Sequence, residues 1–388
     1  MIAADLCRVR LGVTIVRFDM RAILTRCPLL LVAALLLPLA SQAAPQIDTT
    51  YGPLPVFELH SGFWINLHHT LYQEARQRSN SPTSHETADK SSKPTLPVMR
   101  AARAPLTAVE QRAWDDAVAY YVAHYATQDL LFSTELLLLK NQLGDFEDCD
   151  ELSGARKKTC DAGLSPKLTQ ILDAAAPVYR AHLWPDHDRA NRRWIARVAP
   201  LVREQGVGLS ERLADIYQTR WPKDKIRVDV SAYANWAGAY TTLDPLRVTI
   251  ASLDARNQGA EALEVLFHEA SHGIAQPVEL AINRECRQRD KAIPRDLWHA
   301  LIFYTTGEVI KPVMSAQHSP LSTIASSASP TDPDGSVPGG GYVPYAVREG
   351  LYQRGWDDYL KLLIRFWQPY LDNKTTFDDA IAPMVSSL

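Results

Sequence analysis

The sequence has no segment in which lysine and arginine cluster, and its formal net charge is −3. A nucleic-acid-binding surface normally requires a basic patch, so nucleic acid is not an expected partner. The sequence also contains no internal repeat. Its apolar residues make up 46% and its charged residues 22%, which is ordinary for a globular protein and excludes a disordered or fibrous chain.

Long apolar runs are absent except for one near the start, Pro28 to Ala40. Arg21 and Arg26 precede this run and small residues follow it at positions 41 and 43, a pattern typical of a signal peptide over residues 1–43. Met20 offers an alternative start that would leave residues 1–19 outside the protein. A run of this length is too short to cross a bilayer as a helix of about 20 residues. We therefore expect an exported protein, periplasmic or secreted, without stable membrane insertion.

Cysteine is scarce, with five residues in 388, and two of these lie within residues 1–43. Cys149 and Cys160 flank a polar segment, so an oxidising compartment favours a local disulfide between them. Cys286 is left without a partner, and we expect it to be a small buried side chain.

The remaining chain divides by composition. Residues 44–76 form an N-terminal segment with a short helix predicted from Phe57 to Ala75. Residues 77–106 are rich in Ser, Thr, Pro and Lys and predict a flexible linker. Residues 107–222 show helical periodicity throughout. The alternation over 226–230 and the Thr, Val and Ile content of 240–252 then predict strands.

The last region, residues 223–388, returns to helix after these strands. Helices are predicted over 259–274, 296–314 and 345–371, and the Ser-, Pro- and Gly-rich residues 315–344 predict a lid loop. The expected fold is α+β, mostly α-helical, with a small mixed sheet.

The main chemical motif is His268-Glu269-Ala270-Ser271-His272, in the helix predicted over 259–274. Residues four apart lie on one face of a helix, so both imidazoles can bind one ion. Glu269 lies about 100° away, where it can act as general base on a water without binding the metal. Zinc is the natural ion, although ligand type alone does not exclude redox metals. The alternative is that these are polar residues on a solvated helix face.

In this arrangement residues 247–311 resemble the zincin superfamily of metallopeptidases. The resemblance implies a zincin-like core, in which a strand runs above the motif helix and a third ligand comes from farther along the chain. Gly273-Ile274-Ala275-Gln276-Pro277 lacks the histidine of the extended metzincin pattern. The gluzincin branch, with a downstream glutamate, fits better.

Glu308 is the preferred third ligand, because it lies on a mostly apolar predicted helix where an unpaired charge would be costly. Pro312 stands where gluzincins often have an acidic residue. His299 is the rival, and nine residues of helix place it about 180° from Glu308, so both cannot face one ion. Glu279 and Glu285 follow the motif too closely to fold back easily.

A peptidase also needs a hydrogen-bond donor for the oxyanion, and Tyr304 is the preferred candidate, with His299, Tyr345 and Arg348 as alternatives. The adjacent pair at 68–69 resembles a metal motif, but neighbouring helical residues diverge by about 100°, so we expect surface histidines there. The strand over 247–252 is either an internal strand or a sheet edge that binds an extended peptide.

The sequence thus predicts a zinc-dependent hydrolase, most simply a metallopeptidase, with zinc held by His268, His272 and Glu308. Glu269 would activate the water and Tyr304 would assist. The substrate is a peptide by analogy alone, and a cell-wall peptide or another amide remains open. The alternative is an exported binding or scaffold protein whose metal is structural or absent, and Cys286 could then contribute to a closed site.

Overall fold

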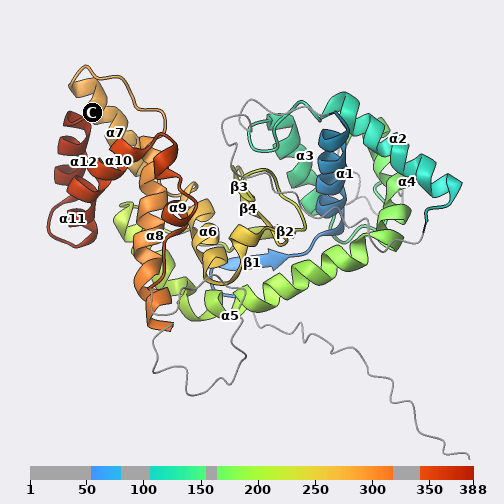
Figure 1. Ribbon diagram of the computed structural model, residues 1–388, viewed down its shortest axis with the longest axis horizontal. Coiled ribbons are helices and arrows are strands. Elements are labelled where there is room, and N and C mark those ends of the chain that lie inside the picture. The colour runs from blue at the N-terminus through green and yellow to red at the C-terminus, as the bar shows by residue number, and fades with distance from the viewer. Residues whose placement is uncertain (1–53, 80–104, 154–163, 318–340) are drawn as a thin grey trace, which may run out of the picture. The chain divides into compact units, whose positions relative to one another are not determined.

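The alternation of residues 226–230 forms a strand in the computed structural model, which describes residues 54–79, 105–153, 164–317 and 341–388. This strand belongs to a mixed sheet with the order β1-β2-β4-β3 (Figure 1). β1, β2 and β4 are parallel, and β3 is antiparallel to β4 at one edge. The strands are β1 (Phe57–His60), β2 (Ile226–Ser231), β3 (Ala239–Leu243) and β4 (Leu246–Ala251).

Helices form most of the described chain, as the periodicity predicts, so the α+β class with a small mixed sheet is confirmed. Several begin at side-chain caps, such as the capping box in which Thr107 and Glu110 satisfy each other's backbone N–H groups. The first five helices are α1 (Phe63–Ser79), α2 (Ala108–His124), α3 (Thr134–Asp145), α4 (Pro166–His182) and α5 (Trp184–Ile216). The later ones are α6 (Gly259–Ser271), α7 (Gln276–Gln288), α8 (Leu297–Gln317), α9 (Tyr345–Arg348), α10 (Asp357–Leu362), α11 (Gln368–Leu371) and α12 (Phe377–Ser386).

The two faces of the sheet differ in polarity. Val228 and Val230 join an apolar cluster that includes residues of α5 and α6. Asp229 alternates with them and points to the other face, where its Oδ2 lies 3.9 Å from Nζ of the fully buried Lys140 on α3. Ser231 shares that polar face and its hydroxyl hydrogen-bonds His69 Nδ1 of α1 at 3.0 Å. The motif helix α6 therefore packs against the apolar face, and α1 and α3 cover the polar face.

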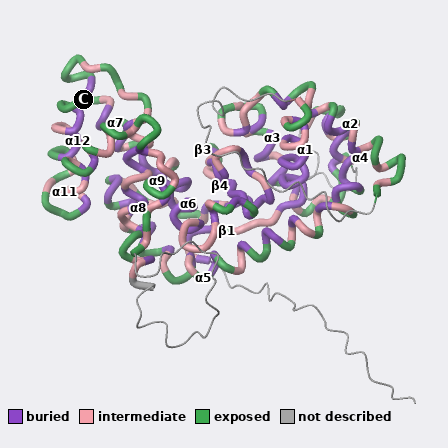
Figure 2. Tube along the Cα trace, in the orientation of Figure 1, coloured by how far each residue is buried: buried purple, intermediate pink, exposed green. Residues whose placement is uncertain are grey.

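The expected surface position of the adjacent histidines is wrong, because both His68 and His69 are fully buried. α1 contacts β2 and helices α2 to α5, so the helix is enclosed on more than one side. Figure 2 colours much of α1 as buried. His68 Nδ1 is hydrogen-bonded to the Tyr121 hydroxyl at 2.9 Å, and His69 Nε2 to the Tyr240 hydroxyl at 2.9 Å. Burial lowers the pKa of His68 to about 3.

Several predicted boundaries also differ. Residues 57–60 form β1, and the helix predicted over 57–75 begins only at Phe63. α6 ends at Ser271, and Pro277 lies in the first turn of α7 rather than marking the end of the motif helix. The long C-terminal helix predicted over 345–371 is divided into α9, α10, α11 and intervening 3-10 and π turns. Of the predicted lid, residues 315–317 belong to α8, and residues 318–340 lie outside the described ranges.

Two further predictions concern cysteine and the membrane. Cys149 is disulfide-bonded, while its expected partner Cys160 lies outside the described residues, as does the predicted signal peptide. Cys286 is a free and buried thiol, as expected. Among the helices of the described ranges, none combines the length and the apolar character needed to cross a membrane.

Candidate metal centre

α6 presents its motif from within the apolar core. Leu263, Leu266 and Phe267 are fully buried and hold one side of the helix against the sheet and neighbouring helices. His268 and His272, one turn apart, share another side, and their ring centroids lie 5.1 Å apart. His272 is the C-cap residue, and its N–H bonds to the carbonyl oxygen of Glu269 at 3.2 Å. The sequence therefore predicted both the helix and the convergence of these imidazoles.

His299 completes a group of three histidines. Its imidazole comes from the first turn of α8, and its ring centroid lies 5.4 Å from His268 and 5.1 Å from His272. One ligand nitrogen from each of the three residues lies within 4.8 Å of the others. A tetrahedral zinc with nitrogens at about 2.05 Å would require separations of roughly 3.3 Å, so the three side chains would have to move closer together to bind one.

The preferred third ligand, Glu308, is not part of this group. Its side chain lies 3.5 Å from Lys311 Nζ, measured from Oε1, and is 27% exposed. Nine residues of α8 separate it from His299, which places the two side chains on opposite sides of the helix. Because His299 faces α6, Glu308 faces away. The geometry therefore favours the ligand that the sequence ranked second.

The three imidazoles are in the form that binds metals. Burial lowers the pKa of His272 to about 3 and that of His299 to about 4. Burial and the neighbouring imidazoles hold the pKa of His268 well below its usual range. All three are thus neutral at pH 7, with a free lone pair each. The buried Nδ1 of His268 has no hydrogen-bond partner, which is costly unless another group binds it. The residues therefore fit a bound cation.

Glu269 lies beside the three histidines but is not one of the candidate metal ligands. The side chain is 8% exposed, and burial raises its pKa to about 7. The hydroxyl of Thr241 lies 2.7 Å from Glu269 Oε2 and 2.8 Å from the Glu269 carbonyl oxygen. Thr241 belongs to β3, the edge strand. A carboxyl with a pKa near 7 can both take up and release a proton at neutral pH.

Aromatic side chains surround the histidines. The ring of Phe303 stacks on His268, with centroids 3.6 Å apart. Trp298 lies 5.5 Å from His272 and Trp356 lies 5.5 Å from His299, in both cases between ring centroids. All three aromatic residues are partly exposed. They give the group apolar surroundings that the sequence does not predict, because Trp298 and Phe303 fit the apolar pattern of a helix whatever their neighbours.

The candidate oxyanion donors are scattered. The hydroxyl of Tyr304 donates to Gln368 Oε1 at 2.7 Å, and burial raises its pKa above the usual range. Arg348 pairs with Glu261 at 2.5 Å. The ring of Tyr345 stacks on that of Phe303, with the centroids 6.0 Å apart, so Tyr345 contacts the ring that in turn stacks on His268. Of the four candidates, His299 alone belongs to the histidine group.

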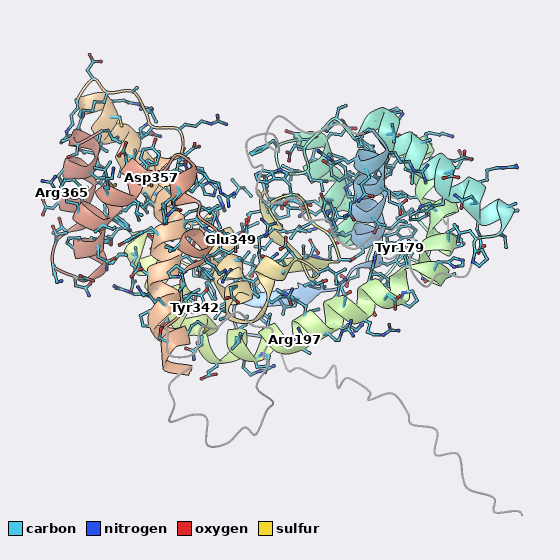
Figure 3. The ribbon with its side chains drawn as sticks, viewed as in Figure 1. Tyr179, Arg197, Tyr342, Glu349, Asp357 and Arg365 are labelled. Carbon is cyan, nitrogen blue, oxygen red and sulfur yellow. The ribbon has the colours of Figure 1, made fainter. Side chains whose placement is uncertain are left out.

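A second buried carboxyl lies one turn before the motif. Glu264 of α6 accepts hydrogen bonds from the Tyr342 hydroxyl at 2.5 Å and from the Tyr345 N–H at 2.9 Å, which attach residues 342–345 to α6. Tyr342 is labelled in Figure 3. Burial raises the pKa of Glu264 to about 7. Gly307 of α8 permits this close approach, since a Cβ there would lie 2.6 Å from Cβ of Pro344. Sequence reasoning missed Glu264, because one acidic residue in a helix carries no signal of burial.

The strand expected over 247–252 is internal, because β4 pairs with both β2 and β3. The edge beside the motif helix is β3, whose Thr241 contacts Glu269.

A scan against protein-family models, a search of curated proteins and a search of solved structures each found no match to this chain. The functional interpretation of the histidine group therefore depends on its own geometry.

Proposed function

We propose that this chain is a zinc-dependent hydrolase that cleaves amide bonds, with His268, His272 and His299 as the metal ligands. The observation that carries the proposal is the convergence of three neutral imidazoles, one buried and two partly buried, whose ligand nitrogens lie within 4.8 Å, beside a buried carboxyl. Three histidines are one of the protein ligand sets of catalytic zinc, and they leave a coordination position for water or substrate. A structural site would more often be closed by a fourth protein ligand.

Zinc at this position would lower the pKa of a coordinated water to about 7 and polarise the substrate carbonyl. Glu269 would accept a proton from the attacking water as the water oxygen bonds to the carbonyl carbon. It would then deliver that proton to the leaving amine nitrogen as the C–N bond breaks. Thr241 positions the carboxyl through its hydroxyl, 2.7 Å from Oε2.

Two features support a peptide-like substrate. β3 is an edge strand beside Glu269, so an extended chain could pair with it through main-chain hydrogen bonds. The partly exposed Trp298, Phe303 and Trp356 around the histidines favour an apolar side chain next to the scissile bond. A strand next to the HExxH helix is also what the resemblance to zincins implies. The proposed substrates also include other amides of similar shape.

Zinc content per chain tests the ligand set. The purified protein would be dialysed and analysed for metal alongside the His299→Ala, His268→Ala and Glu308→Ala variants. We expect about one zinc in the wild type and in Glu308→Ala, and loss of zinc in both histidine variants. Loss in Glu308→Ala with retention in His299→Ala would overturn the assignment of His299. Absence of bound zinc from the wild type, even after reconstitution, would overturn the hydrolase proposal.

Hydrolysis itself requires the Glu269→Gln variant, compared with wild type on a mixed peptide library. We expect Glu269→Gln to keep its zinc and to lose activity by about 10²-fold or more, since general base catalysis contributes typically 10²–10⁴-fold. Equal product formation by both proteins, or none by the wild type with zinc bound, would favour the binding or scaffold alternative.

A further inference from the structure

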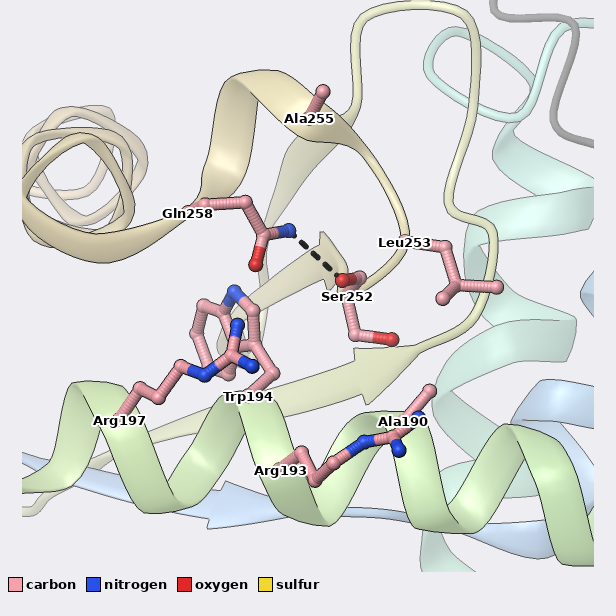
Figure 4. Close-up of a pocket in the computed structure, with 8 residues that line it drawn as sticks. All are labelled: Ala190, Arg193, Trp194, Arg197, Ser252, Leu253, Ala255 and Gln258. Carbon is pink, nitrogen blue, oxygen red and sulfur yellow. Dashed lines mark hydrogen bonds between the residues drawn. The ribbon is translucent and has the colours of Figure 1, made fainter. Parts of the chain in front are cut away.

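A cavity of about 310 Å³ lies between α5 and the segment that leads from β4 to α6 (Figure 4). None of its lining residues belongs to the histidine group. Gln258 of the lining precedes His268 by ten residues, or about 15 Å of helix. Its volume lies at the lower end of the range for small-molecule sites, roughly 300–1,000 Å³. The lining consists of Ala190, Arg193, Trp194, Arg197, Ser252, Leu253, Ala255 and Gln258.

Arg193 and Arg197 give the cavity two positive charges. They are four residues apart on α5 and therefore share one side of the helix (Figure 4). Within the described ranges, neither guanidinium makes a hydrogen bond or ion pair. The neighbouring arginines of α5 behave differently, since Arg189 pairs with Asp186 at 2.5 Å and Arg192 with Asp188 at 2.7 Å. Among the arginines of α5, Arg193 and Arg197 are the two for which the described residues provide no partner.

The remaining lining does not neutralise these charges. It contains no acidic residue. Asp254 lies between two lining residues, but its carboxylate is bound by Arg256 at 2.7 Å. Gln258 directs its amide N–H groups to the backbone oxygens of Ser252 and Asp254. The lining therefore carries a net positive charge from two solvent-exposed guanidinium groups, which a bound anion would compensate.

Part of the lining is apolar. The indole of Trp194 is buried in the apolar cluster, its N–H donates to the Asn257 carbonyl oxygen at 2.6 Å, and it presents a small part of its apolar surface to the cavity. Leu253, Ala190 and Ala255 add aliphatic surface. A ligand that combines an anionic group with an apolar part would contact both kinds of surface.

We propose that this cavity binds a phosphate-bearing ligand, with Arg193 and Arg197 holding the phosphate oxygens and Trp194 and Leu253 contacting an apolar group attached to it. The planar guanidinium donates two parallel N–H groups to adjacent phosphate oxygens, and two such forks match one phosphate. A small organic phosphate and a phospholipid headgroup share this chemistry. The site goes beyond the proposed hydrolase activity and does not depend on it.

Binding of phenyl phosphate, measured by titration calorimetry at low ionic strength, tests the site. We expect one phenyl phosphate per wild-type chain, bound more tightly than inorganic phosphate because of the apolar contacts. Arg193→Gln and Arg197→Gln should each weaken binding by roughly tenfold or more, because each removes charged hydrogen bonds. Arg192→Gln, an arginine of the same helix that is paired with Asp188, is the matched control and should bind as wild type does. Circular dichroism would verify that every variant is folded.

Sedimentation with vesicles separates the two sources of phosphate. Binding to phosphatidylglycerol vesicles but not to phosphatidylcholine vesicles, lost in the double variant Arg193→Gln/Arg197→Gln, would assign the site to a lipid headgroup. Binding of phenyl phosphate without vesicle binding would assign it to a small organic phosphate. The proposal is overturned if the wild type binds neither probe, or if the double variant binds as well as the wild type.

Discussion

The ring of Phe303 lies nearly parallel to the imidazole of His268, with the ring centroids 3.6 Å apart and 20° between the planes. Phe303 follows His299 by one turn of α8, and its ring also lies 4.9 Å from that of His299. α8 thus supplies the imidazole of His299 and also orients the imidazole of His268. This contact matters because the buried Nδ1 of His268 has no hydrogen bond that could orient the ring.

Replacing Phe303 by leucine should weaken zinc binding. Leucine preserves apolar volume but removes the flat surface against His268, and loss of groups that orient a ligand typically costs 10–100-fold in metal affinity. We expect roughly a tenfold loss, measured by competition with a chromogenic chelator. Phe377→Leu is the control, since that ring contacts Trp367 and Tyr370 instead. Unchanged affinity in Phe303→Leu would contradict an orienting role.

Replacing Thr241 by valine should lower kcat with little change in KM. Valine has the same shape but cannot hydrogen-bond Glu269 Oε2, so the carboxyl would lose its orientation while the histidines keep their positions. We expect about a tenfold reduction in kcat with full zinc content. Thr242→Val is the control, because its hydroxyl lies 3.2 Å from Lys140 Nζ on the other face of the sheet. A loss of zinc in Thr241→Val would instead indicate a structural role.

Glu264 should make stability fall as pH rises from about 4.5 to 7. Burial raises its pKa to about 7 in the folded state, against 4.5 ordinarily, so the folded chain keeps a proton that the unfolded chain releases in this window. The contribution is fully present below pH 4.5 and is lost as pH approaches 7, up to about 3 kcal/mol. Urea unfolding of wild type and Glu264→Gln at both pH values measures it.

The expected result is that the stability of the wild type relative to Glu264→Gln decreases between these pH values. Glu279→Gln, at an exposed position of α7, should show no such trend. Parallel pH profiles for wild type and Glu264→Gln would argue against a protonated, buried Glu264.

Lys140 should make the stability of the folded chain rise with pH, at higher pH than the Glu264 effect. Burial lowers its pKa to about 8 from 10.5, with Asp229 opposing the shift, so between these values the unfolded chain binds more protons than the folded one. Stability relative to Lys140→Met should therefore rise by up to about 3 kcal/mol from pH 8 to 10.5. Urea unfolding across this range measures the rise. Lys374→Met, at an exposed site, should lack it, and a flat difference for Lys140→Met would refute a depressed pKa.

The motif helix could be predicted because its signal is local. Buried apolar residues recur at helical spacing in α6, and His268 and His272 are separated by one turn, so their convergence depends on helix geometry alone. The α+β class was equally accessible, since periods of 3.6 and 2 residues distinguish the two kinds of element.

The third ligand could not be predicted in the same way, because it depends on how α8 is rotated against α6. Leu297, Leu301 and Ile302 are fully buried on several sides of α8, so the apolar pattern does not indicate one inward face. The preference for Glu308 over His299 therefore depended on the cost of an unpaired charge and not on a defined inward face. Tertiary packing decides between them.

Two other differences have the same origin. β1 merges in the sequence with the start of α1, because two residues separate them and both are rich in aromatic and aliphatic side chains. The burial of His68 and His69 follows from helices and a sheet that enclose α1 on several sides. Periodicity along one segment carries no information on how many neighbours it will have.

α5 contacts α1 and α4, which share one apolar cluster, and also α6, α8 and β2, which share the other. Its 33 residues correspond to about 50 Å of helix. Because α5 packs against both clusters, displacement of the helix during unfolding of one cluster would also expose apolar surface of the other. The two clusters should consequently melt together in a single cooperative transition, as one folding unit rather than as independent domains.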